Sequence, residues 1–362
     1  DLLGAGIDYL ADITDQALTD TNINPVLHSL IIDGVFVGVG SVMSFLPIIT
    51  ILFFLLSIME DSGYIPRVAF FMDKLLRRLG LSGRSIVPLL LGFGCSVPAI
   101  MATRTLPSKR DRYMTILLIP FMSCSAKLPI YAMFTAAFFG GHKALIMFVL
   151  YLLGILVAII SALLLKDTIF RGNPVPFVMV LPNYRMPVLK SVWLRMWENI
   201  VGFIRRAFTI IFVATIIIWL LQSFDTGFNM VANSDQSILA KIGVLAVPVF
   251  APLGFGDWRA ATALVTGLSA KEAVVSTFAI LLGAPDSASL PSMMGEIFTP
   301  LTAFSFLVFS LLYMPCVAAL AAARREIGHI WGALATVIFQ TGVAWIVAYT
   351  VYNVGKLISY LI

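Results

Sequence analysis

Charged residues are scarce in this sequence. Only 12% of its 362 residues are Asp, Glu, Lys or Arg, whereas 60% are hydrophobic, and the mean hydropathy is +0.98. A soluble globular protein needs a more strongly charged surface, so this composition excludes that class. The net charge of +5 comes from Lys and Arg residues in the loops between apolar segments, which indicates membrane topology rather than binding of nucleic acid.

Catalytic motifs and a disulfide framework are also missing. The three cysteines all lie in apolar segments, and the sequence has no CxxC pair, HExxH motif, Walker A loop or Ser/His/Asp arrangement. The three histidines (His28, His142 and His329) fall in predicted loops or interfaces and are not assigned as ligands. The sequence therefore gives no case for an enzyme. No cleavable signal peptide is present, and a chain that opens with Asp1 instead of Met is expected to be a fragment.

What the sequence does have is long apolar runs. A membrane-spanning helix needs roughly 20 apolar residues. The predicted spans are 35–59, 113–137, 143–165, 203–222, 301–323 and 330–352. Basic residues in 74–84 and 103–112 place both ends of the segment 85–102 on the cytoplasmic side, so we predict a re-entrant hairpin there. The segment 242–283 is predicted to be re-entrant as well, or to span twice.

Two stretches of the sequence match one another. The segment that begins at Arg84 aligns without a gap with the one that begins at Arg259, so that Gly92 pairs with Gly267. Further on, M-S-C-S-A-K-L (122–128) pairs with M-P-C-V-A-A-L (314–320). The charge pattern orients the two halves oppositely, and an inverted repeat with Gly- and Pro-broken segments is typical of secondary transporters. The predicted fold class is therefore an all-α polytopic membrane protein.

The predicted organisation follows from this repeat. An amphipathic segment on the outer face (1–30) precedes the first repeat (31–165). A basic cytoplasmic loop (166–202) leads to the second repeat (203–362). Within the first repeat, residues 61–80 are predicted to form an amphipathic helix along the inner membrane interface. Within the cytoplasmic loop, the Pro-rich segment 171–187 is expected to be extended.

The cysteines are the strongest candidates for binding a ligand. Cys95 follows two glycines and precedes Pro98, Cys124 lies between two prolines, and Cys316 follows Pro315. Such breaks free backbone carbonyls, and a thiol beside them suits a borderline divalent cation. The alternative is that these are small side chains packed where backbones approach closely.

Several other side chains are candidates for the same route. Met122 and Met314 accompany two of the cysteines at equivalent positions, although methionines alone more often fill a core than bind a ligand. Glu60 and Asp61 end the first span, either as a solvated helix end or as carboxylates that collect a cation. Burying Lys271 and Glu272 in an apolar hairpin is costly, so they are expected to mark a pathway or to pair with each other. Lys127 is expected to pair similarly or to carry the positive side of a gate.

Six segments that carry these residues resemble the membrane domain of FeoB, the family of prokaryotic ferrous-iron transporters. They are E-D-S-G-Y (60–64), G-L-S-G-R-S (80–85), G-F-G-C-S-V-P-A-I-M-A-T-R-T-L (92–106), P-F-M-S-C-S-A-K-L-P (120–129), L-S-A-K-E (268–272) and Y-M-P-C-V-A-A-L-A-A-A-R-R-E (313–326). The two repeats correspond to the Gate motifs of that family, which nucleoside-transporter-like proteins share. Ser96 and Lys127 stand where the family commonly has Asn and Arg.

The resemblance implies a multi-pass permease domain that imports Fe²⁺ across the bacterial inner membrane. It implies that Cys95 and Cys124 are the ion-pathway cysteines and that Cys316 is the cysteine of the second Gate. It also implies an N-terminal cytoplasmic G domain that binds GTP with Mg²⁺ and is absent from this sequence. The partners it implies are the lipid bilayer, that G domain and small cytoplasmic Feo accessory proteins, with homo-oligomerisation left open and no nucleic acid.

Two rival functions stay open on the residues alone. One is transport of another divalent metal, or of an organic solute such as a nucleoside, on the same scaffold. A nucleoside carrier would need Asn, Gln and Glu at the broken segments, where this chain has Cys and Met. The other is a membrane scaffold that transports nothing, against which the cost of burying Lys271 and Glu272 argues.

Overall fold

The structure is helical throughout the part of the chain that it describes. The computed structural model describes residues 9, 13–16, 18–19, 25–172, 183–205, 209–225, 227, 229–231, 236–283 and 289–361. Across these ranges the elements are α-, 3₁₀- and π-helices, with one isolated bridge between Phe224 and Met230. The predicted all-α class is confirmed. Most of the predicted outer segment 1–30 and the middle of the predicted extended loop 171–187 lie outside the described residues.

Two compact units make up the chain, and each is built from two separate segments. The first comprises Asp1–Asp61 and Met186–Ile242, and the second comprises Ser62–Arg185 and Gly243–Ile362. The described helices of the first unit are α2 (Pro25–Ser29), η1 (Leu30–Phe36), α3 (Val37–Asp61), α10 (Leu189–Phe203), α11 (Thr209–Ser223) and the start of α12 (Ile238–Phe250).

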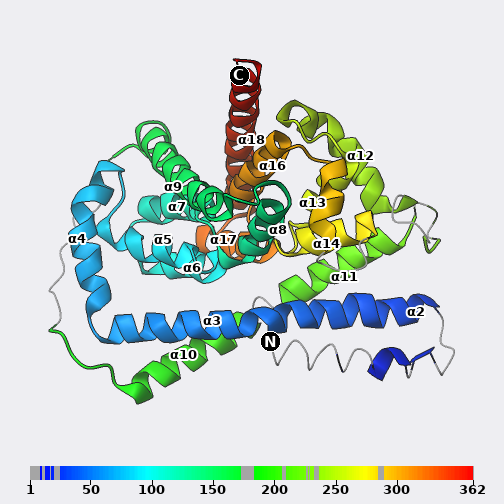
Figure 1. Ribbon diagram of the computed structural model, residues 1–362. Coiled ribbons are helices and arrows are strands. Elements are labelled where there is room, and N and C mark those ends of the chain that lie inside the picture. Colours follow the sequence, from blue (N-terminus) through cyan, green and yellow to red (C-terminus); the bar gives the residue numbers. More distant parts are fainter. Residues whose placement is uncertain are drawn as a thin grey trace. The chain divides into compact units, whose positions relative to one another are not determined.

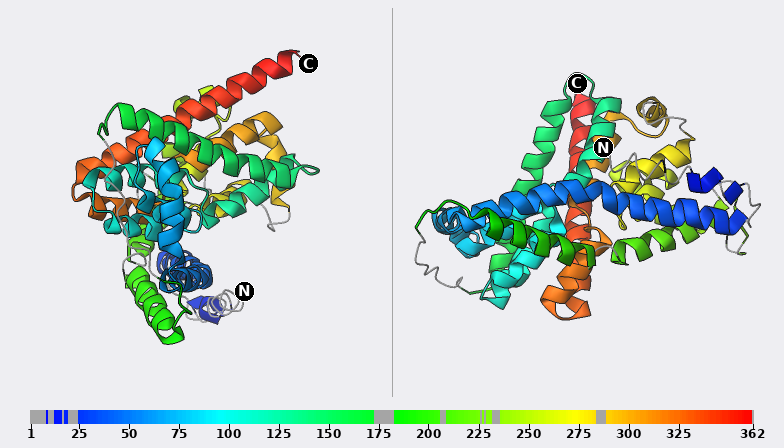
Figure 2. Two further views of the ribbon diagram at one scale, coloured as in Figure 1. Left: turned by 90° about the vertical axis from the view of Figure 1, so that its left-hand side faces the viewer. Right: turned by 90° about the horizontal axis from the view of Figure 1, so that it is seen from below.

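In the first unit, α10 lies alongside α3 (Figures 1 and 2). Val192, Met196 and Ile200 recur every four residues of α10 and are buried, so they form the stripe that faces its neighbour. Trp193 and Trp197 lie on the other side and are exposed. Aromatic side chains of this kind are typical of the membrane–water interface.

The second unit contains all remaining described helices. They are α4 (Tyr64–Arg78), η2 (Gly83–Ser85), α5 (Ile86–Gly92), α6 (Ser96–Ala102), η3 (Thr103–Thr105), α7 (Lys109–Leu118), η4 (Ile119–Phe121), η5 (Ser125–Lys127), α8 (Leu128–Phe138), α9 (Lys143–Asp167), η8 (Ala251–Leu253), α13 (Trp258–Thr266), α14 (Ala273–Leu282), α15 (Leu290–Met293), η9 (Met294–Glu296), α16 (Pro300–Leu312), α17 (Val317–Ile327) and α18 (Ile330–Leu361), together with the end of α12.

Four stretches of this unit are long and apolar enough to cross a membrane. They are Lys109–Phe138, Lys143–Asp167, Pro300–Ile327 and Ile330–Tyr360. If each sharply bent pair of helices is counted as one span, the described residues hold up to six spans. The chain is therefore a multi-pass membrane protein by the length and composition of its helices.

The segments predicted to be re-entrant are broken helices. In the first repeat α5 and α6 are joined through residues 93–95, and in the second α13 and α14 are joined through residues 267–272. The chain also bends by 106° between Ile238–Leu253 and Trp258–Thr266, so the segment 242–283 is not one straight helix. Whether it enters and leaves the membrane on one side stays a prediction.

α4 has the amphipathic character predicted for residues 61–80. It begins after Gly63, whose φ of 78° is a left-handed conformation that favours glycine. Ala69 and Leu76 are buried, whereas Phe70 and Phe71 are exposed, and basic residues fill the last turn. A basic helix with exposed phenylalanines suits a membrane surface, and its place at the inner interface stays a prediction.

Aromatic rings form the centre of the second unit. Phe134 of α8 stacks on Phe306 of α16 with ring centroids 4.9 Å apart, and Phe278 of α14 meets Phe306 edge-on at 5.8 Å. Phe298, just before α16, contacts Phe134 at 5.2 Å. This cluster joins helices of both repeats into one hydrophobic core, and the broken segments pack against that core.

Candidate cation site at the helix breaks

Each of the three cysteines stands at the first residue before a helix. Cys95 precedes α6, Cys124 precedes η5 and Cys316 precedes α17, all with an extended backbone (ψ of 132°, 160° and 156°). The local cause is the composition of the breaks, since Gly94 directly precedes Cys95 and Pro315 directly precedes Cys316. Cys124 lies further from such residues, between Pro120 and Pro129. Each thiol therefore lies at the N-terminal end of a helix, where the first backbone N–H groups have no intrahelical partner.

Each repeat has two breaks. The first breaks are residues 93–95 and 267–272, and the second breaks are residues 122–124 and 313–316. In each repeat the first break is hydrogen-bonded to the second or to the residue that directly follows it. Gly94 in the first break accepts hydrogen bonds from the backbone N–H and the hydroxyl of Ser125, at 3.2 and 2.9 Å. In the second repeat the carbonyl of Leu268 accepts a hydrogen bond from the N–H of Val317 at 2.7 Å. Ser125 and Val317 each directly follow a cysteine, so the same connection holds Cys124 and Cys316 beside the first break of their repeats.

The paired glycines permit this close approach. A Cβ at Gly92 would lie 3.3 Å from Met122, and one at Gly267 would lie 2.5 Å from the hydroxyl of Tyr313. Both neighbours belong to the second break of the same repeat. The glycine that aligns in the two repeats is thus the position where one break packs against the other.

These connections bring the three cysteines into one neighbourhood. Cys95 lies close enough to Cys124 and Cys316 for charges on the three sulfurs to interact, and Glu272 lies within the same range of Cys95 and Cys316. Cys124 is buried, whereas Cys95 and Cys316 are partly exposed. Within the described ranges, however, no three His, Cys, Asp or Glu side chains are close enough together to hold a metal ion as they stand.

Met122 and Met314 belong to the core. Met122 is buried, and Met314 packs against the same hydrophobic cluster from a partly buried position. Each stands two residues before a cysteine, as the sequence comparison indicated. Their role as sulfur ligands stays a prediction.

Glu60 and Asp61 make contacts within the first unit. Glu60 forms an ion pair with Arg195 at 3.0 Å, and Asp61 is buried and accepts a hydrogen bond from the N–H of Val188 at 2.8 Å. Val188 directly precedes α10 and Arg195 lies in its middle, so these carboxylates fasten the end of α3 to that helix. Their predicted role in collecting a cation is untested.

Two buried lysines bind backbone carbonyls at the breaks. The ammonium group of Lys127 donates to the carbonyls of Pro120, Met122 and Leu311 at 3.0, 3.2 and 2.7 Å. The ammonium group of Lys271 donates to the carbonyl of Met314 at 2.8 Å and lies 3.0 Å from the centre of the Tyr313 ring. Lys271 was expected to mark a pathway or to pair with Glu272. Its contacts in the structure do not include an ion pair with Glu272.

Tyr313 as a partner of Lys271 was missed in the sequence. Its ring supplies a negatively polarised face to the ammonium group, and its hydroxyl donates to the carbonyl of Leu264 at 3.3 Å. The signal that was available is the alignment of Tyr313 with Phe121, which places an aromatic ring before each second break.

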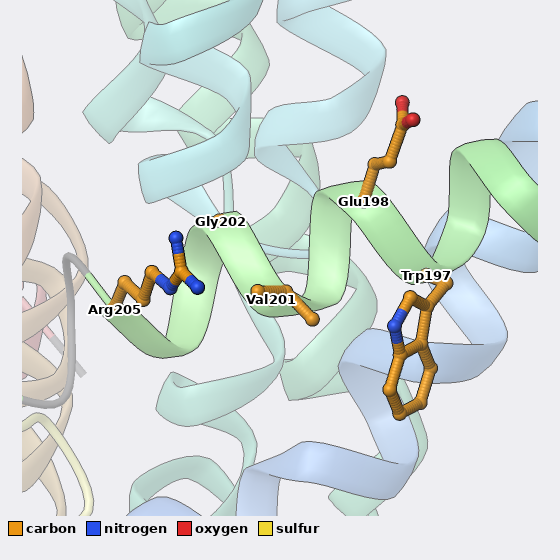
Figure 3. Close-up of a pocket in the computed structure, with 5 residues that line it drawn as sticks. All are labelled: Trp197, Glu198, Val201, Gly202 and Arg205. Carbon is orange, nitrogen blue, oxygen red and sulfur yellow. The ribbon is translucent and has the colours of Figure 1, made fainter.

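A shallow hollow of roughly 310 Å³ runs along α10 in the first unit (Figure 3). It is lined by Trp197, Glu198, Val201, Gly202 and Arg205. Four of the five residues lie on α10, and Arg205 lies two residues beyond its end. Glu198 points away from Trp197 (Figure 3). None of the predicted site residues lines this hollow, so we assign it no part in cation binding.

The fold and the breaks together define a multi-pass membrane domain with paired interrupted helices. The profile of the Gate family, described as nucleoside recognition, matches residues 42–138 and 204–330, and a second profile, described as the C terminus of ferrous iron transport protein B, matches residues 147–199. The chain therefore belongs to the Gate family and corresponds to the C-terminal transmembrane domain of the FeoB proteins.

Individual relatives agree with this assignment. The chain is 43% identical over 349 residues to a protein of Staphylococcus aureus (strain MSSA476) named Fe(2+) transporter FeoB, an alignment that covers 95% of this chain and 52% of the relative. It is 39% identical over 364 residues to the protein of that name from Methanocaldococcus jannaschii, covering 98% of this chain and 54% of the relative. A third relative, 39% identical over 404 residues, is a Fe(2+) transport protein A/Fe(2+) transporter FeoB fusion protein of Porphyromonas gingivalis, with 99% of this chain and 47% of the relative aligned.

The chain spans about half the length of the curated relatives it matches. No solved structure shows a significant match to it.

Proposed function

We propose that this chain is the permease domain that carries Fe²⁺ into the cell across the bacterial inner membrane. The observation that supports the proposal is that Cys95, Cys124 and Cys316, from three separate helix breaks, lie within electrostatic range of one another. Thiols suit a borderline divalent cation such as Fe²⁺, and broken helices are where membrane transporters bind their substrates. The names of the relatives point to the same ion.

Fe²⁺ is the substrate in this proposal and not a resident cofactor. The three thiols are the proposed ligands, with Met122 and Met314 as additional sulfur donors. Glu272 contributes negative potential from the second repeat, and Glu60 and Asp61 do so in the first unit. Because the thiols are near one another without forming a finished ligand set, we expect the cation to draw them together.

One of the proposed partners is supported by a comparison, and the others rest on the resemblance to FeoB. A relative fused to Fe(2+) transport protein A supports contact with a small cytoplasmic accessory protein. Coupling to a cytoplasmic G domain that binds GTP and Mg²⁺ would lie in the part of the relatives that this chain does not cover. The lipid bilayer is the remaining partner, and we assign no catalytic residue to this chain.

Uptake into proteoliposomes tests the proposal. The full-length protein would be given Fe²⁺ under anaerobic conditions, with Zn²⁺, Mn²⁺ and a nucleoside as competing substrates. We expect Fe²⁺ accumulation that falls in Cys95→Ser and in Cys124→Ser, because a hydroxyl is a poor ligand for this ion. Ser276→Ala is the control, since Ser276 is exposed on α14 and lies outside the breaks.

Three results would decide against parts of the proposal. Wild-type Fe²⁺ uptake by the Cys95→Ser/Cys124→Ser double variant would remove the thiols from the transport site. Accumulation of the nucleoside without any metal would assign the chain to organic solute transport. Equal uptake of Zn²⁺ and Fe²⁺ would leave a metal transporter without selectivity for iron.

A further inference from the structure

The two buried lysines occupy equivalent places in the repeats although they come from different positions in the sequence. Met122 and Met314 each stand two residues before the cysteine of their second break, and the carbonyl of each accepts a hydrogen bond from a lysine ammonium group. Lys127 follows Cys124 by three residues, whereas Lys271 comes from the first break of the second repeat. The equivalent carbonyl in each repeat therefore accepts a hydrogen bond from a lysine, although the two lysines come from non-equivalent positions in the sequence.

The three hydrogen bonds of Lys127 match the donor count of an ammonium group. Three carbonyl oxygens surround its Nζ at 3.2 Å or less, and only the protonated form has three N–H donors to satisfy them. Lys271 lies over the face of the Tyr313 ring in addition to its carbonyl, which is an arrangement for a cation. Both side chains are 3% exposed, so water solvates neither group and the protein carbonyls and the Tyr313 ring are their main partners.

Carbonyl oxygens are the ligands that hard cations prefer. Na⁺, K⁺, Mg²⁺ and Ca²⁺ are bound in proteins by oxygen, and rings of backbone carbonyls suffice to select K⁺ in channels. The Lys127 site has three converging carbonyls, which is part of such a cage, and an ammonium group fills it. None of the hydrogen bonds described above joins either lysine to the thiols of Cys95, Cys124 and Cys316.

We propose that Lys127 and Lys271 are specificity-determining residues, whose ammonium groups occupy the carbonyls freed by the second breaks and so exclude hard cations. The thiols, which neither lysine occupies, remain for a borderline transition metal. This inference rests on the proposed function in that it assumes a cation pathway at the breaks. It assigns selectivity to residues that do not touch the transported ion.

The test is the flux of a hard cation through proteoliposomes that contain the full-length protein. We expect Lys127→Ala to raise Rb⁺ flux on the order of tenfold over wild type, which corresponds to a barrier lowered by about 1.4 kcal/mol. Lys127→Arg keeps a charge and several donors and should leave Rb⁺ flux low. Lys143→Ala removes an exposed lysine at the start of α9 and is the matched control.

A second measurement covers the case in which Lys127→Ala folds poorly. Thermal unfolding in detergent would be compared in potassium chloride, methylammonium chloride and choline chloride. An emptied carbonyl cage should bind the two small cations, so the variant should melt at a higher temperature with them than with choline, whereas wild type should not. Lys271→Ala, which loses one carbonyl bond and one ring contact, provides a second variant with a milder defect.

The outcomes separate this inference from the proposed function. Unchanged Rb⁺ flux together with melting that ignores the cation would overturn the inference and reduce both lysines to structural contacts. High Rb⁺ flux in the wild type would overturn it as well. Failure of wild-type protein to take up Fe²⁺ would instead count against the proposed function, because the Rb⁺ comparison depends only on the difference between variant and wild type.

Discussion

At the scale of single residues, the aligned glycines have a clear physical purpose. Gly92 and Gly267 were recognisable from the sequence as a repeated pair, but the sequence did not say what they contact. In the structure each is the point where the first break of a repeat packs on the second. A side chain at Gly267 would collide with the hydroxyl of Tyr313 and with Val274, at 2.5 and 2.6 Å.

We therefore expect Gly267→Ala to destabilise the protein by about 1–3 kcal/mol, the usual cost of overpacking a core. The measurement is thermal or denaturant-induced unfolding of the purified protein in detergent. Gly342→Ala is the matched control, because nothing lies within 4 Å of a Cβ at that position of α18. The control should be neutral or should stabilise by up to about 1 kcal/mol, since alanine is the better helix former.

The cause of the destabilisation can be tested with the hydroxyl of Tyr313. In the Gly267→Ala/Tyr313→Phe double variant the nearest clashing atom is gone. The double variant should lose less stability than the two single variants added together. Strict additivity would show that Gly267 is required for some reason other than its contact with Tyr313.

At the scale of helices, the positions of the breaks could be predicted and their partners could not. Glycine and proline act locally, so G-F-G-C and M-P-C indicated interrupted helices directly. The carbonyl of Leu311 that binds Lys127 lies 184 residues away in the sequence, and no local pattern encodes such a pairing. For the same reason the sequence left open whether Lys271 pairs with Glu272, whereas the structure places it on Met314 and Tyr313.

The aromatic cluster is the contact on which helices of both repeats depend. Phe306 of α16 is fully buried against Phe134 and Phe278. Phe306→Ala should cost about 3–5 kcal/mol of unfolding free energy, because it removes packing and leaves a cavity. Phe148→Ala on α9 is the control of the same chemistry, since Phe148 is 64% exposed and should cost far less.

The comparison is made by unfolding both variants under identical detergent conditions. A loss of similar size in the two variants would show that the phenylalanines act mainly through lipid or detergent contact. A large loss in Phe306→Ala alone would confirm that α8, α14 and α16 are held together by this cluster.

At the scale of the whole molecule, the repeat and the compact units divide the chain differently. The sequence revealed a repeat because two segments share glycines, prolines and cysteines, and the Gate profile matches twice. The compact units instead combine Asp1–Asp61 with Met186–Ile242, and Ser62–Arg185 with Gly243–Ile362. Similarity between segments reports common ancestry and local structure, whereas compactness depends on long-range packing, so only the first could be read from the sequence.

The three thiols could form one cation-binding site or separate sites, here called stations, that bind the ion one after another. They come from both repeats but belong to the same compact unit, and they lie within range of one another's charge without forming a ligand set. Two thiols that bind one ion act as a unit, and removing either should then cost nearly as much as removing both. Two stations that bind the ion in turn should instead give losses that multiply.

We expect the first result. Fe²⁺ uptake by Cys95→Ser/Cys124→Ser should fall no further than uptake by the weaker of the two single variants, because a cation that has lost one thiol gains little from the other. The rates would be measured in parallel at one Fe²⁺ concentration below saturation, with Ser276→Ala setting the scale of nonspecific loss. A double variant whose loss equals the product of the single losses would show that Cys95 and Cys124 bind the ion independently, and the breaks would then be two stations along a path.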